Sequence, residues 1–398
     1  MIKQVILPVT LFVTTLTVAI YCLLIFKIQP MVEKSENEIV EHKPYMISPK
    51  TKVIHDNLII ADWHSDSLLW ARDLTKRSNY GHVDIPRLLE GNIAIQMFTV
   101  VTKSPKSQNY KRNTDGFDNI TLLSVVQLWP VSTWNSLTER ALYQAEKLHK
   151  FAEEEPQKLF VVKSKEELKS RLSKRKALKK EGKDGFVIGM LGIEGLHALD
   201  GKIENIKLLY DAGYRMMGLL HFFDNKIGGS LHGVSRGGLT GFGRKTVRRL
   251  NELSIIIDLA HSSPGVVKDV LKLSTKPVVI SHTGMYGKYK SPRNISDDLM
   301  KEIAKKGGLI GIGYWRGAIG NTSPKNIAAS IQYAINLVGV DHVALGSDFD
   351  GSVKTSFDTS EIAVITQELI KAGLSKTDIS KVMGLNSVNF LMNNLPDK

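Results

Sequence analysis

The chain has 398 residues, of which 42% are hydrophobic and 23% are charged, a globular composition that excludes a disordered or fibrous protein. Its formal net charge is +13, and the run from Lys163 to Asp184 alone supplies +6, with ten basic residues against four acidic ones. No aromatic residues interleave these charges to stack on bases, so we interpret the run as a solvated helix face and expect no nucleic-acid partner. Contact with anionic lipid is the alternative.

The N-terminal part of the chain predicts a single membrane anchor. Residues 5–26 carry no charge, and 22 helical residues are long enough to cross the hydrocarbon core of a bilayer. A cleaved signal peptide is the rival, but its apolar region is usually only about 7–15 residues long. We therefore expect residues 1–4 in the cytoplasm, residues 27–50 as a polar tether, and residues 51–398 as a catalytic domain outside the cytoplasmic membrane. This anchor, and the lack of any disulfide partner for the single Cys22, favour a bacterial envelope protein.

The rest of the chain alternates short apolar runs with helical patterns, which predicts repeated βα units around a parallel sheet. The predicted strands are 57–61, 93–101, 186–193, 215–220, 255–260, 277–281, 309–313 and 342–347. Eight such units indicate an α/β fold of the (β/α)8 TIM-barrel type, preceded by the transmembrane helix. Residues 109–184 are too long for a simple crossover, and we expect extra helices there, including 137–153.

The first predicted strand leads to His64 and Asp66, which stand two residues apart. In an extended segment such side chains point to the same side, so this pair could bind one divalent ion. Taken alone, the pattern more often marks a turn in which Asp66 or Ser65 caps the next helix.

Polar residues follow most of the other predicted strands as well, at the rim where barrel enzymes place their active sites. The complete set of candidates is His64, Asp66, Glu194, His221, His261, His282 and Asp348. Seven such groups exceed the needs of one tetrahedral zinc, which favours a centre of two metal ions. We expect His64 and Asp66 to bind one ion and His261 and His282 the other. Glu194 and a hydroxide would bridge the two ions, and Asp348 would move protons.

The sequence resembles the membrane dipeptidases, which are zinc peptidases related to renal dipeptidase in the amidohydrolase superfamily. The resemblance extends from about Asn57 to Asn389 and rests on nine motifs in order. These motifs are DWHSD, HVDIPRLLEGN, GIEGLHAL, LLHFFDNKIGGSLHG, GLTGFGRKTVRRLN, IIIDLAHSS, VVISHTG, SPRNISDD and LGSDFDG. It implies a metallo-dipeptidase with two Zn²⁺ per chain and a dipeptide substrate.

The resemblance also implies individual roles. His64, Asp66, Glu194, His261 and His282 match the zinc ligands, and Asp348 matches the proton shuttle. His221 resembles the residue that steadies the tetrahedral intermediate, and Arg293 the one that binds the terminal carboxylate of the substrate. Without the family context, Arg293 would be interpreted as a surface residue near a helix that starts at Ile295.

Several points stay open at this stage. Trp63 and Ser65 replace the Gly and Asn that are commonest in the family, so substrate contacts beside the first ligand pair are expected to differ. Asp224, Asn225, Tyr314 and Trp315 either line the pocket or pack in the barrel, and the oligomeric state is open, a homodimer included. The histidines expected to be structural or on the surface are His55, His82, His149, His197, His232 and His342. The alternative functions are hydrolysis of N-acyl-D-amino acids, β-lactams or lactones, or a tethered binding protein without catalysis.

Overall fold

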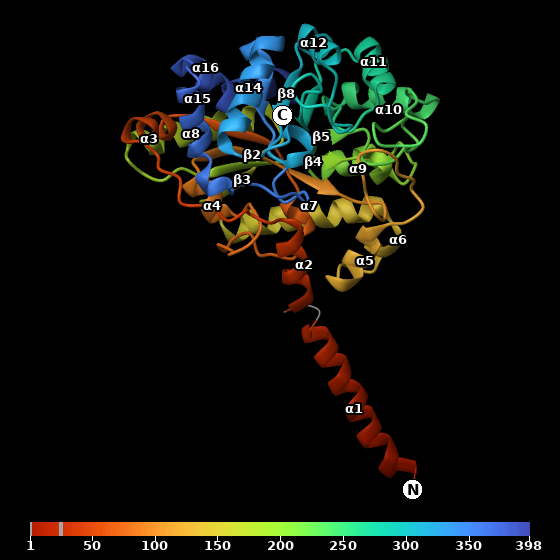
Figure 1. Ribbon diagram of the computed structural model, residues 1–398. Coiled ribbons are helices and arrows are strands. Elements are labelled where there is room, and N and C mark those ends of the chain that lie inside the picture. Colours follow the sequence, from red (N-terminus) through yellow and green to blue (C-terminus); the bar gives the residue numbers. More distant parts are fainter. Residues whose placement is uncertain (1, 24–26) are drawn as a thin grey trace.

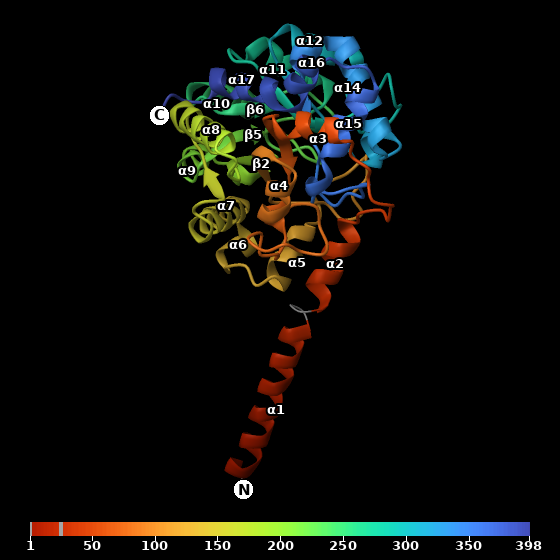
Figure 2. The same cartoon turned by 90° about the vertical axis from the view of Figure 1, so that its left-hand side faces the viewer.

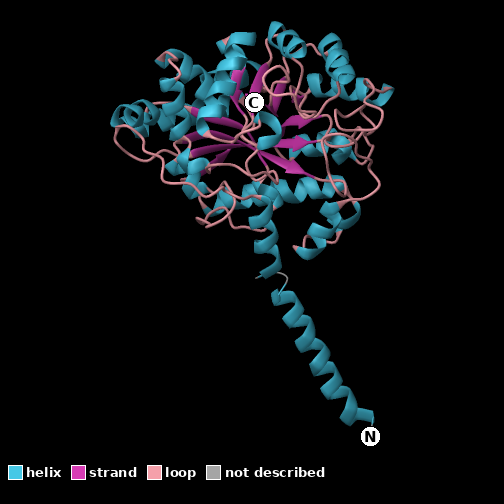
Figure 3. Cartoon of the chain, viewed as in Figure 1, coloured by secondary structure: helices cyan, strands magenta, loops and turns pink. Residues whose placement is uncertain are grey.

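In the computed structural model, residues 2–23 and 27–398 are described, apart from the side chains of residues 2–11 and 20. Helices surround a central set of strands, and α1 (Ile2–Leu23) lies apart from this body (Figures 1 and 3). The predicted anchor, residues 5–26, falls partly outside the described residues. Within the described part of the chain, no helix has both the length and the apolarity needed to cross a membrane. The membrane anchor is therefore not confirmed and stays a prediction.

Eight parallel strands close into a barrel, as predicted. The described residues contain nine strands: β1 (Ile60–Ser65), β2 (Ile93–Val101), β3 (Leu159–Val161), β4 (Val187–Glu194), β5 (Tyr214–Gly218), β6 (Ile256–Asp258), β7 (Val279–Thr283), β8 (Leu309–Ile312) and β9 (Val343–Leu345). The order around the sheet is β2-β1-β9-β8-β7-β6-β5-β4, and pairing of β2 with β4 closes the ring. The unpredicted β3 pairs with residues 187–189 of β4, ahead of the residues that pair with β5.

The first strand begins three residues later than predicted, at Ile60 instead of Asn57. The preceding residues form α3 (Pro49–Asp56), whose N-cap Ser48 accepts a hydrogen bond from Thr51 N and whose C-cap is Asn57. Serine at the N-cap followed by proline at N1 favours a helix start. The prediction gave more weight to the apolar run 58–61 and therefore began the strand too early. His64 therefore lies within β1, and Asp66 follows its last residue.

The helices of the barrel lie outside the strands (Figure 3). They are α4 (Ile85–Glu90), α5 (Asn119–Val126), α6 (Ser132–Asn135), α7 (Leu137–Glu154), α8 (Lys165–Lys180), α9 (Asn205–Asp211), α10 (Gly241–Glu252), α11 (Pro264–Leu273), α12 (Asp297–Lys305), α13 (Arg316–Ile319), α14 (Pro324–Val338), α15 (Ala363–Lys371), α16 (Lys376–Ser380) and α17 (Asn386–Asn394). The predicted extra helices of residues 109–184 are present as α5 to α8. The basic run forms α8, in which only Leu168 and Arg175 are buried, in agreement with a solvated helix face.

The segment expected to be a polar tether, residues 27–50, contains more structure than predicted. It forms α2 (Gln29–Glu36), and the chain then runs beside the loop that follows β9 before it enters α3. Both views place α2 next to the body of the barrel, near α5 (Figures 1 and 2). The side chain of Gln29 donates a hydrogen bond of 2.6 Å to Val126 O at the end of α5.

Apolar side chains fill the amino-terminal half of the barrel interior and leave the carboxyl ends of the strands polar. Ile95, Met97, Met190 and Met216 belong to this inner cluster, which continues onto Phe390 of α17. Parallel strands of one barrel end at the same rim, so the polar residues that follow them meet in one place.

Candidate metal centre and active site

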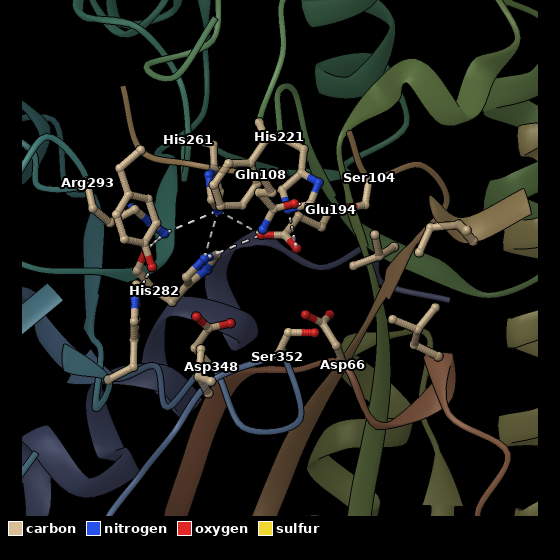
Figure 4. A pocket seen from close by; sticks show the side chains of 18 residues that line it. Asp66, Ser104, Gln108, Glu194, His221, His261, His282, Arg293, Asp348 and Ser352 are labelled. Atoms are coloured by element: carbon tan, nitrogen blue, oxygen red, sulfur yellow. Dashed lines mark hydrogen bonds and ion pairs between the residues drawn. The ribbon is translucent and has the colours of Figure 1, made fainter. Parts of the chain in front are cut away.

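Six of the seven candidate residues line one cavity of about 90 Å³ at the carboxyl ends of the strands. The seventh, His64, does not line it, but its Nε2 lies 3.5 to 3.8 Å from carboxylate oxygens of Asp66, Glu194 and Asp348. His64 and His282 lie within β1 and β7, and Glu194 is the last residue of β4. His221, His261 and Asp348 each follow a strand by three residues, after β5, β6 and β9. All of these side chains are buried, and Figure 4 shows Asp66 and Asp348 across the cavity from Glu194 and His282.

Glu194 lies at the centre of the group. Its Oε1 is 3.0 Å from His261 Nε2, 3.4 Å from His282 Nε2 and 3.7 Å from His64 Nε2. Its Oε2 is 3.2 Å from His221 Nε2. One carboxylate therefore reaches imidazoles from four strands of the barrel.

Three overlapping groups of side chains have ligand atoms close enough to bind a metal ion. His64, Asp66 and Glu194 form one group, and Glu194, His261 and His282 form another. These two groups share Glu194, which is the arrangement expected for a bridging ligand. The third group, His64, His282 and Asp348, also brings the expected proton shuttle within ligand distance of two histidines.

The electrostatics of these residues fit a cation. Burial lowers the pKa of His64, but the carboxylates of Asp66, Glu194 and Asp348 outweigh it and raise this pKa to about 10. Burial raises the pKa of Glu194 well above its usual value, and it lowers the pKa of His261 and His282. His64 Nε2 and Glu194 Oε1 are buried and have no hydrogen-bond partner within the described part of the chain. A metal ion beside the carboxylates could take the place of the proton on His64, and the neutral imidazoles of His261 and His282 could bind an ion as well.

A serine and an aspartate behind the cavity, which the sequence analysis missed, orient two of the histidines. Ser281 Oγ donates a hydrogen bond of 2.6 Å to Asp258 Oδ2. The same oxygen lies 3.0 Å from His64 Nδ1 and 2.9 Å from His282 Nδ1. Because its only proton points to Asp258, Ser281 Oγ accepts hydrogen bonds from the Nδ1–H groups, which leaves the Nε2 lone pairs toward Glu194. The sequence signal was weak, since both residues lie in buried strands and resemble core positions.

Two of the candidate residues have a backbone conformation that is uncommon for side chains with a Cβ. The φ angles of His261 and Asp348 are 60° and 63°. Left-handed conformations of this kind are held by the surrounding structure and cluster at functional sites.

Arg293 is buried and lines the cavity, which excludes the interpretation as a surface residue. Its Nη2 donates a hydrogen bond of 3.2 Å to His282 O and lies 3.2 Å from His261 Nε2, and the guanidinium group lies over the ring of Trp315. Burial lowers the pKa of Arg293, while Asp348 opposes this shift. The arrangement leaves a cation at the wall of the cavity.

The structure distinguishes the four residues that were expected either to line the pocket or to pack in the barrel. Trp315 lines the cavity, whereas Tyr314 packs against Phe349 and Phe357. Asp224 accepts hydrogen bonds from backbone N–H groups of its own loop, and Asn225 donates one to Leu219 O.

Neither the Trp63 nor the Ser65 side chain lines the cavity, and the expectation that substrate contacts beside the first ligand pair differ stays a prediction. The indole N–H of Trp63 donates to Ser387 Oγ at 2.8 Å, and the ring packs on Phe390. Ser65 Oγ instead pairs with Ser67 Oγ.

Further lining residues were not predicted. Ser104, Gln108 and Tyr110 come from the loop after β2, and Ser352 and Val353 come from the loop after β9. Loop residues carry no periodic signal, so only the tertiary structure brings them to the cavity.

A family model and several known proteins match this chain. The family description Membrane dipeptidase (Peptidase family M19) matches residues 49–393. Dipeptidase aclJ of Aspergillus oryzae is 27% identical over 358 residues, which cover 83% of this chain and 77% of that protein. Dipeptidase ataJ of Aspergillus terreus is 24% identical over 390 residues, and the match covers 88% of each chain.

A solved structure shows the same fold. It is a metallopeptidase from Rhodobacter sphaeroides liganded with a phosphinate mimic of the dipeptide L-Ala-D-Ala. It superposes with a TM-score of 0.69 at 22% identity and covers 85% of this chain and 99% of that one.

Proposed function

This chain belongs to the membrane dipeptidase family, peptidase family M19, and on that premise we propose that it hydrolyses dipeptides at a centre of two zinc ions. The observation that carries the proposal is the position of Glu194, whose Oε1 lies 3.0 to 3.7 Å from the Nε2 atoms of three histidines and is shared by two ligand groups. His64 and Asp66 would hold one ion, His261 and His282 the other, and Glu194 both. Bound zinc would supply a water molecule of lowered pKa and polarise the peptide carbonyl.

Arg293 is proposed to bind the terminal carboxylate of the substrate. A guanidinium group can bind a carboxylate through two parallel hydrogen bonds, and its burial at the cavity wall strengthens this interaction. The cavity of about 90 Å³ suits a small substrate, so recognition of a free carboxylate would restrict hydrolysis to very short peptides.

His221 is proposed to stabilise the negative charge that develops on the carbonyl oxygen. Burial lowers the pKa of His221 to about 3, so its imidazole is neutral at neutral pH and carries one N–H. Its position beside Glu194 places this donor next to the proposed ligands. A donor aimed at developing charge is more effective in the transition state than in the ground state.

Asp348 is proposed to carry protons. Burial raises the pKa of Asp348 to about 7, with His64 and Arg293 opposing the shift. Cations bound beside it would lower this pKa, so the carboxylate would be ionised at rest and able to accept a proton. It would accept a proton from the attacking water and donate it to the nitrogen of the leaving amine as the peptide bond breaks.

We also propose that residues 5–26 anchor the enzyme in a membrane as a single-pass segment, with the barrel on the extracytoplasmic side of a bacterial envelope. The support is the uncharged run of 22 residues. Retention of the full chain in the membrane fraction after alkaline washing, and digestion of the barrel by protease added outside spheroplasts, would agree with this location. Release by washing would contradict it.

The decisive experiment combines metal analysis with a substrate panel. We expect the purified full chain to contain about two zinc ions, to hydrolyse dipeptides including L,D pairs, and to lose activity with a chelator and regain it with zinc. N-acetylated D-amino acids, a β-lactam and a lactone complete the panel. Preference for one of these would redirect the proposal to another hydrolytic activity, and a metal-free, inactive chain would refute it.

A further inference from the structure

Helix α2 (Gln29–Glu36) and its C-cap Asn37 pack against the body of the protein through polar side chains. Gln29, Glu33 and Asn37 are buried, with exposed fractions of 9%, 2% and 1%, while Met31 and Val32 face solvent. Residues spaced by four lie on one face of a helix, so the three polar residues form its contact surface. Buried polar groups require specific hydrogen-bond partners, which makes this contact more selective than apolar packing.

The partner of Asn37 lies on the loop that follows β9, which forms one wall of the cavity. Asn37 Oδ1 accepts a hydrogen bond of 2.9 Å from the backbone N–H of Ser352, and Ser352 lines the cavity. Just beyond, Thr355 N donates to Glu38 O at 3.1 Å, and Val40 N donates to Thr355 O at 2.8 Å. Residues 38–40 therefore run beside the loop and form one parallel β-bridge with it, between Ile39 and Thr355.

A buried chain of charges makes a second connection to the same loop. Arg72 Nε pairs with Glu33, and Arg72 Nη2 lies 2.6 Å from Asp350 Oδ2. Asp350 also accepts hydrogen bonds from Ser67 Oγ at 2.7 Å and from His82 N at 2.6 Å. Asp350 is thereby held two residues after Asp348.

The loop needs such support because its backbone is unusual. Asp348, Asp350 and Ser352 have φ angles of 63°, 62° and 57°. Residues with a Cβ rarely adopt a left-handed conformation, and here three such residues stand at alternate positions. Local backbone preferences do not stabilise this conformation, so contacts from outside the loop must hold it. Two of these three residues are held, directly or through Arg72, by α2 and Asn37.

We propose that Glu33 and Asn37 are positioning residues of the active site, which fix the loop that carries Asp348 and Ser352. The inference rests on the proposed function, because it assumes that Asp348 transfers protons. The segment that follows residues 5–26 is then part of the active-site framework as well as a connection to the anchor.

Asn37→Ala in the full chain tests the proposal, because it removes the acceptor for Ser352 N–H. Glu36→Ala is the matched control, since Glu36 is exposed on the same helix. We expect kcat for a dipeptide to fall about 10-fold in Asn37→Ala with KM and zinc content nearly unchanged, and the control to match the wild type. We expect a smaller loss on the matching depsipeptide, in which an ester oxygen replaces the amide nitrogen, because its leaving group depends less on protonation.

Glu33→Gln provides a second variant if Asn37→Ala does not fold. It keeps an oxygen acceptor for Arg72 and removes the charge, so we expect the same pattern with a smaller loss. Wild-type kcat in the folded variants would overturn the inference, and so would an equal loss on both substrates accompanied by loss of zinc. An inactive wild-type chain would instead refute the proposed function.

Discussion

Two walls of the cavity are held in different ways. The histidine wall, formed by Glu194, His221, His261 and His282, lies at the ends of neighbouring strands and faces Asp348 and Ser352 across the cavity (Figure 4). The loop wall, residues 348–353, is held by side chains of Asn37, Ser67 and Arg72 that lie more than 270 positions earlier in the chain. The barrel itself therefore orders the proposed metal ligands, whereas remote contacts order the proposed proton carrier. Loss of metal and loss of catalysis should then be separable by mutation.

The largest effect is expected at the centre of the histidine wall. Glu194→Gln removes the negative charge shared by both ligand groups and leaves the imidazoles around a neutral amide. Loss of one partner in a buried charged cluster is worth about 3–5 kcal/mol, so zinc affinity should fall at least about 100-fold and activity should fall with it. Zinc analysis after dialysis, together with the dipeptide assay, measures both. Full zinc content with full activity would exclude a bridging role.

Asp348→Asn tests the loop wall and should separate the two properties. The amide keeps nearly the same shape but cannot accept and return a proton, so kcat should fall about 100- to 10,000-fold. Zinc content should stay near that of the wild type, because the histidine wall and Asp66 are unchanged. Loss of zinc in this variant would show that Asp348 binds metal, as its proximity to His64 and His282 allows.

Ser281→Ala weakens the support behind the histidine wall. It removes the acceptor for both Nδ1–H groups and leaves Asp258 without the serine hydroxyl. Zinc affinity should fall about 10- to 100-fold, as for other residues that orient metal ligands. Competition with a chelator of known affinity measures the change, and Ser330→Ala, a buried serine in α14, is the control. Equal affinities in the two variants would argue against the orienting role.

Arg293→Lys retains the charge but replaces the planar guanidinium with a single ammonium. One of two charge-assisted hydrogen bonds to the substrate carboxylate would be lost, so KM for dipeptides should rise about 10-fold. Hydrolysis of a dipeptide amide, which lacks the carboxylate, should be equally slow in both proteins. An unchanged KM would remove Arg293 from substrate binding.

The smallest effect on activity is expected at His55, which lies outside both walls. Its ring contacts Thr366 Oγ1 at 2.8 Å and Gly91 O at 3.2 Å, and burial lowers its pKa to about 4. The neutral form contributes stability above the unfolded pKa of about 6.5, and this contribution is lost as the pH falls through 4. The lowering of the His55 pKa from 6.5 to about 4 corresponds to about 3 kcal/mol in the free energy of unfolding.

Urea unfolding of the wild type and of His55→Gln between pH 7 and pH 4 measures this contribution. The stability difference between the two proteins should shrink as the pH falls, while kcat at neutral pH stays the same. A difference that is independent of pH would show that His55 is not the titrating group.

Much of the candidate site could be predicted because strand ends leave a local signal. Each of His64, Glu194, His261, His282 and Asp348 follows or ends an apolar run, and the barrel brings these ends to one rim. The residues behind and beside them leave no such signal. Ser281 and Asp258 resemble ordinary strand residues, and their role follows only from contacts between β1, β6 and β7.

The sequence by itself determined the eight-stranded barrel, the rim on which the polar residues meet, and the helical insertion between β2 and β4, because these depend on apolar periodicity and strand order. Only the tertiary structure decided the start of β1 after α3, the packing of Trp63 away from the cavity, and the docking of α2 on the loop wall. A helix that packs through Gln29, Glu33 and Asn37 has no apolar stripe, so its partner is defined by individual hydrogen bonds that only the folded chain reveals.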